Sequence, residues 1–291
     1  MPSLKEVRNK IVSVGSTMQI TSAMKMVSAA KLKRAQDAIT QMRPYAGKLR
    51  EMLQNVSASV DASENIYART APKLKKVLIV ALSSNRGLAG AFNSNIIRKT
   101  NSLIKGDYAD CEVTVLSVGR KVSEAFRRTK YGILGSDLPH HTNELYDKLT
   151  FDNVAPVAQK LMDAFTSGEF DKIVVVYNQF KNAAVQATVE EQLLPIVPTV
   201  SEGSPTDYIF EPGQQYIVDE LIPRSIKIQF YKALLDSFAS EHGARMTAMH
   251  KATDNAKALQ RDLRITYNKA RQASITKEIL EIVAGAEALN G

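Results

Sequence analysis

The sequence predicts an α/β protein in which a Rossmann-like α/β domain with a mostly parallel sheet is inserted into a long antiparallel coiled coil of N- and C-terminal helices. Both ends of the chain are long, almost free of helix breakers, and apolar at helical spacing. The middle instead alternates short apolar runs with helical segments. We therefore expect an N-terminal coiled-coil helix over 1–60, an inserted domain over 74–205, and a C-terminal helix over 215–291 that pairs with the first.

The N-terminal segment has an apolar residue at every third or fourth position, which places one stripe along a helix. The only helix breakers before about residue 60 are Gly15, Pro44 and Gly47. We expect the stripe to slip by one residue after Val27, and Pro44 to kink or break the helix. The stripe comprises Leu4, Val7, Ile11, Val14, Met18, Thr21, Met24 and Val27, and then Leu32, Ala35, Ile39, Met42 and Ala46.

The middle of the chain predicts βαβ units. Short runs rich in apolar and β-branched residues indicate strands at Val77–Ser83, Glu112–Val118, Ile173–Tyr177 and Ala184–Leu194. Helical patterns are found near Asn93–Lys105, Lys121–Arg128 and Phe151–Phe165. Because strands and helices alternate, the sheet should be mostly parallel and covered by helices on its faces.

The C-terminal segment has no proline after Arg224 and only two glycines, Gly243 and Gly285, before the last residue. Its apolar stripe advances by about 3.45 residues per step, close to the ~3.5 of a left-handed coiled coil. The N-terminal helix is the simplest partner, and a domain joining the inner ends of the two helices makes the pair antiparallel. The stripe comprises Leu235, Phe238, His242, Met246, Met249, Ala252, Ala256, Leu259, Leu263, Tyr267, Ala270 and Ala273.

The last turns of this helix are apolar on most faces, at Ile275, Ile279, Leu280, Ile282, Val283, Ala284 and Ala286. A helix that is apolar nearly all round is usually buried. The C-terminal helix is longer than its partner, so we expect other subunits to enclose this end. Just before it, Asn268–Glu278 is rich in charged and amide groups. These groups fit an ordinary exposed helix or a grip on a surrounding subunit, and the apolar end favours the grip.

The net charge of +8 is carried by the first 50 residues, which hold ten Lys or Arg and two acids, whereas the remaining residues balance. A basic helix fits an acidic protein partner, the phosphates of a nucleic acid, or a merely solvated face. Charge alone leaves all three open.

We expect no catalytic residue, bound cofactor or metal. The loop Ser83–Asn93 follows a strand and opens a helix, but it has neither phosphate-binding glycine motif and is interpreted as a tight turn. The adjacent His140 and His141 lack companion ligands, and the single cysteine, Cys111, fits a small core residue. No apolar run is long enough to predict direct membrane insertion.

Motifs along the whole chain resemble those of the gamma subunit of the F-type ATP synthase. They are Ile20–Arg34, Arg43–Tyr45, Asn85–Leu88, Ala244–Met249, Ala252–Asn255 and Tyr267–Ala288. The resemblance implies a non-catalytic rotor inside a head of alpha and beta subunits, with a foot that contacts epsilon and the c-subunit ring. It also implies that proton-driven rotation is coupled to ATP chemistry on beta, on the cytoplasmic face of a bacterial inner membrane. The sequence lacks the cysteine-pair insertion of the redox-regulated chloroplast form.

The resemblance also implies roles for particular residues. A beta loop called the catch, together with the upper head, should engage Arg271, Gln272, Thr276 and Glu278. An acidic lever on beta should press on the surface that holds Met24, Lys31, Lys33 and Arg34. By the same resemblance, the c ring should meet Tyr208 and Glu211. The all-round apolar pattern of the C-terminal end separately leads us to expect an apolar bearing at Ile275, Ile279, Ile282 and Val283. The alternative function is that of a basic coiled-coil protein that binds nucleic acid.

Overall fold

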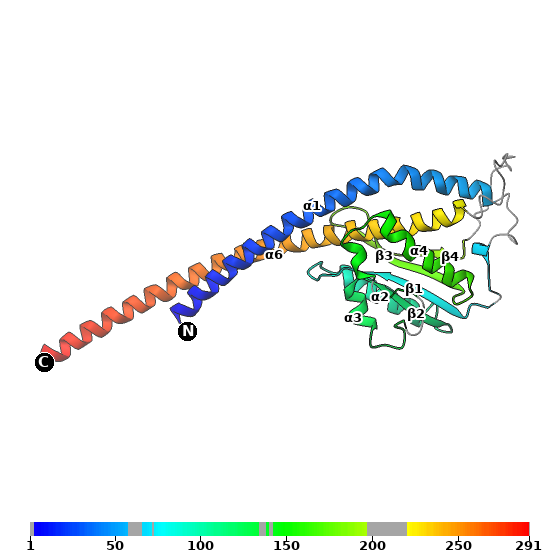
Figure 1. Ribbon diagram of the computed structural model, residues 1–291. Helices are drawn as coiled ribbons and strands as arrows, with labels where there is room; N and C mark the ends of the chain where they lie inside the picture. Colours follow the sequence, from blue (N-terminus) through cyan, green and yellow to red (C-terminus); the bar gives the residue numbers. More distant parts are fainter. Residues whose placement is uncertain are drawn as a thin grey trace. The chain divides into compact units, whose positions relative to one another are not determined.

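The computed structural model describes residues 3–57, 66–71, 73–133, 138–139, 142–196 and 220–290 (Figure 1). The chain forms two compact units. The helical unit combines Met1–Ser28 with Met246–Gly291, and the sheet unit comprises Ala29–Arg245. Two long helices, α1 (Leu4–Ser57) and α6 (Ile222–Asn290), each contribute residues to both units. The division into 1–60, 74–205 and 215–291 stays a prediction.

The sheet unit is built on four strands in the order β2-β1-β3-β4. Strand β1 (Lys76–Leu82) pairs in parallel with both β2 (Glu112–Val118) and β3 (Lys172–Phe180). Strand β4 (Gln186–Leu194) pairs antiparallel with β3 at one edge. The predicted mostly parallel sheet is therefore confirmed.

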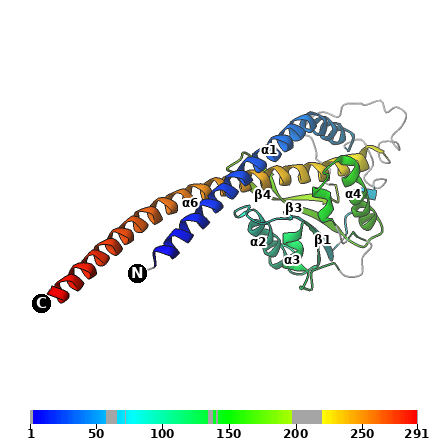
Figure 2. The same ribbon diagram turned by 60° about the vertical axis from the view of Figure 1, so that its left-hand side comes forward.

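Helices cover both faces of this sheet (Figures 1 and 2). One face packs on α4 (Phe151–Thr166) and the first part of α6, and the other packs on α2 (Phe92–Lys105) and α3 (Arg120–Phe126). The short 3-10 helices are Ile66–Ala68 and Asn143–Tyr146. In β1, Leu78, Val80 and Leu82 face the α4 side, while Val77, Ile79 and Ala81 face the α2 side. Burial on both faces explains why β1 is continuously apolar.

Helix α1 continues unbroken through Pro44, so of the two predicted effects the break is wrong, and the kink stays a prediction. Pro44 is exposed, and the carbonyl that loses its helical partner belongs to Thr40, which is exposed as well. Water can therefore satisfy that carbonyl, and the proline is tolerated on this side of the helix.

The predicted slip in the α1 stripe is also wrong. Val27 is exposed, whereas Ser28 is buried and Lys25 is half-buried. With these two polar residues included, the inward positions repeat every seven residues from one end of the stripe to the other. One set is Leu4, Ile11, Met18, Lys25, Leu32, Ile39 and Ala46, and the other is Val7, Val14, Thr21, Ser28, Ala35, Met42 and Leu49.

In the helical unit, α1 and α6 run antiparallel, as predicted. Thr21 Oγ1 lies 2.8 Å from Thr253 Oγ1. A Cβ atom at Gly15 would lie 3.0 Å from Gln260 Nε2, so the numbering of one helix falls as that of the other rises. Two predicted members of the α6 stripe are wrong, because Leu259 and Ala273 are exposed. The inward positions are instead Met249, Thr253, Ala256, Gln260, Leu263, Tyr267, Ala270 and Ser274.

Candidate partner-binding surfaces

The C-terminal end of α6 is uncovered in the helical unit. Ile282 is 71% exposed and Leu280 is 63% exposed, and Ile275, Ile279 and Val283 are each exposed by about half. Apolar surface of this extent is uncommon on an isolated soluble protein and is typical of a protein–protein contact. The four predicted bearing residues Ile275, Ile279, Ile282 and Val283 thus lie together on this end.

The predicted catch residues precede and overlap this apolar end. Thr276 Oγ1 donates to the carbonyl of Gln272 in its own helix at 3.0 Å, and Glu278 Oε1 accepts from Ser274 Oγ at 3.4 Å. Arg271 and Gln272 are exposed, and within the described residues their side chains make no hydrogen bond or ion pair. Their donors therefore point to solvent and are free to meet a partner.

A second apolar surface was missed by the sequence reasoning. Val12, Ile20, Met26 and Val27 are all largely exposed on α1 within the helical unit. They occupy heptad positions that face away from the seam with α6. The signal was present in the sequence, because the correct heptad register places Val27 outside and Ser28 inside.

The predicted lever residues are divided between the two units. Met24 belongs to the helical unit, where it is half-buried. Lys31, Lys33 and Arg34 belong to the sheet unit, where all three are exposed. Lys33 Nζ makes an ion pair with Asp37 Oδ1 at 2.8 Å, although an exposed pair of this kind stabilises little.

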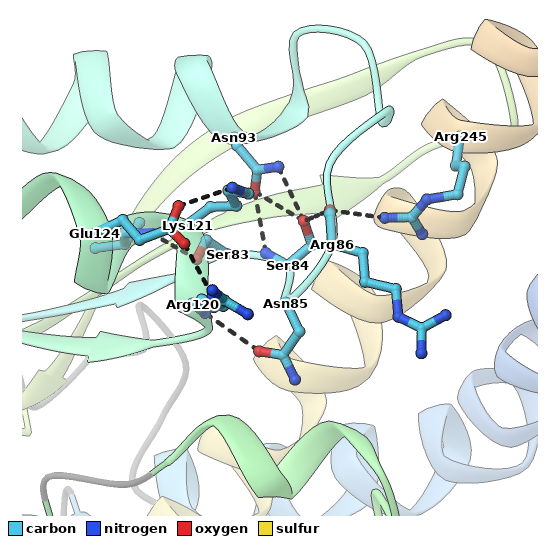
Figure 3. A network of polar contacts seen from close by, with 10 residues as sticks. Ser83, Ser84, Asn85, Arg86, Asn93, Arg120, Lys121, Glu124 and Arg245 are labelled. Carbon is cyan, nitrogen blue, oxygen red and sulfur yellow. Dashed lines mark hydrogen bonds and ion pairs between the residues drawn. The ribbon is translucent and has the colours of Figure 1, made fainter.

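The loop between β1 and α2 is fixed by a network of amide and hydroxyl side chains (Figure 3). Asn93 Oδ1 accepts from the backbone N–H of Ser84 at 3.0 Å, and Ser83 Oγ accepts from that of Val122 at 3.0 Å. Asn85 Oδ1 accepts from the N–H of Arg120 at 3.2 Å. In a nucleotide site such N–H groups would face phosphate. Their use by the protein itself favours the structural turn.

Gly119, between β2 and α3, completes this network and tolerates no side chain. Its φ of 110° lies in the region that favours glycine, and its N–H donates to Asn143 Oδ1 at 3.2 Å. A Cβ atom here would lie 2.1 Å from the carbonyl oxygen of Ser83. The close approach of the two strand ends therefore depends on this glycine.

Close to this network, α6 carries a buried ion pair that the sequence reasoning also missed. Arg245 Nη1 donates to Glu241 Oε1 at 2.6 Å, and the two side chains are only 8% and 9% exposed. Burial raises the pKa of Glu241 against the opposing effect of Arg245. Burial, with the nearby charges of Arg245 and Lys31, lowers the pKa of His242 to about 3, so the imidazole is neutral near pH 7.

Other chemistry has little support in the described residues. They contain no group of three potential metal ligands and no helix that could cross a membrane. Cys111 is a free, half-buried thiol that packs against the α2 side of the sheet. His140, His141, Tyr208 and Glu211 lie outside the described residues.

The structure thus defines a class of protein in which long terminal helices pair with each other, continue into an α/β domain, and carry exposed apolar and polar contact surfaces. The family model described as ATP synthase matches residues 3–289. The ATP synthase gamma chain of Flavobacterium johnsoniae is 58% identical over all of both chains, and that of Chlorobaculum tepidum is 45% identical over 99% of both. The chain therefore belongs to the ATP synthase gamma chain family.

Solved structures agree with this assignment. A chain of the Euglena gracilis mitochondrial ATP synthase has a TM-score of 0.68 and 21% identity, covering 98% of this chain and 94% of its own, which supports the fold. A chain of the Tetrahymena thermophila central stalk and c ring has a TM-score of 0.57 and 26% identity, covering 80% of this chain and 99% of its own. The gamma chain is a non-catalytic rotor subunit, and the nucleic-acid alternative gains no support.

Proposed function

We propose that this chain transmits proton-driven rotation of a c-subunit ring to the beta subunits of the catalytic head, where ATP is made or hydrolysed. The observation that carries the proposal is the uncovered apolar end of α6. Burial contributes about 25 cal/mol per Å² of apolar surface, so the alpha and beta subunits gain free energy by enclosing this end. An apolar contact also lacks directional bonds, which suits a surface that must turn inside its partners.

The group around Arg271 is the proposed grip on beta. The free guanidinium of Arg271 and the free amide of Gln272 supply directional donors beside the apolar end, and Thr276 and Glu278 extend the polar surface. Differential contacts of this kind are needed because a shaft that met all three beta subunits equally could not bias them toward different conformations.

The basic face of α1 is the proposed seat of the acidic beta lever. Lys31 and Arg34 are exposed cations, and Lys33 is shared with Asp37. Charge complementarity favours an acidic partner and orients its approach. Met24, in the other unit, is assigned to the same partner.

The foot contacts are proposed to involve epsilon and the c ring. Tyr208 and Glu211 are the residues assigned to the ring by family resemblance. Because the relatives include gamma chains of bacteria, we propose that the complex lies on the cytoplasmic face of the inner membrane and that its partners hold this chain there.

The test uses inverted membrane vesicles that carry the assembled complex. Replacing Arg271 and Gln272 by alanine should lower ATP synthesis and hydrolysis strongly, because both lost groups face a partner rather than the chain itself. Replacing Ile279 and Ile282 by serine should weaken coupling of hydrolysis to proton pumping. Arg261→Ala is the matched control, since it removes another exposed arginine of α6. Normal activity of both test variants in fully assembled complexes would refute the proposal.

A further inference from the structure

The last residues of α6 within the sheet unit are tied to the sheet by polar contacts. This α6 junction comprises Ser240 and Arg245 on the helix, with Asn178 near the end of β3 and the loop carbonyls of Arg86 and Gly87. Glu241 pairs with Arg245 within the helix. Arg245 is the final residue of the sheet unit, and α6 continues without interruption into the helical unit. Any twist carried by this helix between the two units therefore passes Arg245.

Each nitrogen of the Arg245 guanidinium makes a hydrogen bond, and Figure 3 shows the one to the carbonyl of Arg86. Nη2 donates to the carbonyl oxygens of Arg86 at 3.0 Å and Gly87 at 3.3 Å, and Nε donates to Gly87 at 3.3 Å. Nη1 donates to Glu241 Oε1 at 2.6 Å. The planar fork fixes the direction of each bond, which a flexible ammonium group cannot do.

The gripped loop is itself rigidly placed. Ser84 Oγ donates to the carbonyl of Arg86 at 2.6 Å, and Leu88 and Gly90 hold positive φ values of 61° and 57°. Together with Asn93 at the start of α2, which binds Ser84, these features make the loop a fixed part of the sheet unit.

The remaining contacts extend the tie across the sheet. Ser240 Oγ donates to the carbonyl of Asn178 at 2.8 Å, and Asn178 Nδ2 donates to the carbonyl of Phe92 at 3.1 Å. Gly243 approaches the next loop so closely that a Cβ atom there would lie 3.3 Å from Ala183 Cα. Since residues two apart on a helix point about 200° from each other, Gly243 and Arg245 fix α6 from nearly opposite sides.

We infer that Arg245 is a positioning residue that fixes the rotational angle of α6 relative to the sheet unit. Torque applied to the sheet unit then reaches α6, and torque applied to α6 reaches the sheet unit, without slip. Apolar packing alone is non-directional and resists rotation of a helix about its axis weakly. The hydrogen bonds from Arg245 to the carbonyls of Arg86 and Gly87, and the buried hydrogen bond from Ser240 to Asn178, resist it more strongly, because rotation of α6 would separate these donors from acceptors on the sheet unit. The inference rests on the proposed rotor function.

The experiment compares assembled complexes in inverted vesicles that carry Arg245→Lys, Ser240→Ala, or neither. Lysine retains the positive charge beside Glu241 but cannot fork to two carbonyls. The largest proton gradient that ATP hydrolysis can maintain should fall severalfold in Arg245→Lys, while the initial rate of hydrolysis stays nearly unchanged. The same gradient should fall less in Ser240→Ala. Glu124→Gln, which breaks an exposed ion pair with Arg120 in the same unit, is the control and should match the wild type.

A wild-type gradient in assembled Arg245→Lys complexes would overturn the inference, as would losses of hydrolysis and pumping in equal proportion. If Arg245→Lys does not assemble, Ser240→Ala decides, and a wild-type gradient in that variant would overturn the inference. Failure of the proposed rotor function would give a different experimental result. In that case, complexes depleted of this chain would still pump protons on ATP addition, whatever residue stood at position 245.

Discussion

The hydrogen bond between Thr21 and Thr253 gives a measurable test of the helical-unit seam. The two Oγ1 atoms lie 2.8 Å apart, and each also lies near a carbonyl of its own helix, Met18 at 3.1 Å and Met249 at 2.8 Å. Two hydroxyl protons serve three contacts, so one hydroxyl donates across the seam and the other donates to its own helix. Replacing either threonine by valine keeps the shape and removes the bond between the helices.

Each single variant should lose about 1 kcal/mol of unfolding free energy, the usual net value of one hydrogen bond. The hydroxyl that remains keeps its own helix carbonyl, so no additional cost of a stranded polar group arises. In the double variant two methyl groups meet where two hydroxyls were, and the total change should return close to zero. The interaction energy of the double-mutant cycle then has a magnitude of about 2 kcal/mol.

Urea unfolding of the purified chain, followed by circular dichroism of the helices, measures the cycle. Thr266→Val is the control for the helix propensity of valine, because Thr266 is exposed and donates only within its own helix, to Asp262 at 2.9 Å. Additive losses in the double variant would refute the reasoning, since they would mean that the two hydroxyls stabilise the unit independently.

Two further predictions concern the sheet unit. Gly119→Ala should lower the free energy of unfolding in urea by about 3 kcal/mol or more, because it combines backbone strain with an overlap against Ser83. Gly47→Ala is the control and should not destabilise the chain, because a Cβ atom there meets no atom within 4 Å. Equal effects of the two substitutions would contradict this prediction. His242 has an ordinary pKa of 6.5 and a folded-state pKa of about 3, so the unfolded chain binds the proton first and stability falls as pH drops from 6.5 toward 3. The loss should reach about 2 kcal/mol at pH 5 and be absent from His242→Gln; parallel pH profiles for the two proteins would count against it.

The central strands were predictable from sequence because β1 and the Ile173–Tyr177 part of β3 are buried on both faces and are therefore continuously apolar. The seam of the coiled coil was harder to place. Lys25, Ser28 and Gln260 hold inward positions that a search for apolar residues passes over, and exposed Val27 and Leu259 take their place. A lysine can bury its stem and keep its charged end in water, so inward position and polarity do not exclude one another.

The candidate surfaces divide in a similar way. The exposed end of α6 followed from its all-round apolar pattern and its excess length. The role of Arg245 could not be predicted, because the carbonyls that it binds lie 158 and 159 residues away and belong to the backbone, which carries no sequence signal. The exposed apolar surface of α1 was not predicted because the heptad register of the helix was misplaced. That register decides both which residues face α6 and which face away from it.

The polar seam and bare apolar end of the helical unit have a consequence for the newly made chain. The sheet unit buries a large apolar core on each face of its sheet, whereas the helical unit places Thr21, Ser28 and Thr253 between its helices and leaves Ile282 uncovered. Exposed apolar helix surface promotes aggregation until a partner covers it. The cell must therefore make this chain in proportion to its partners. The same apolar surface that stabilises the assembled complex limits how much of the unassembled chain can stay in solution.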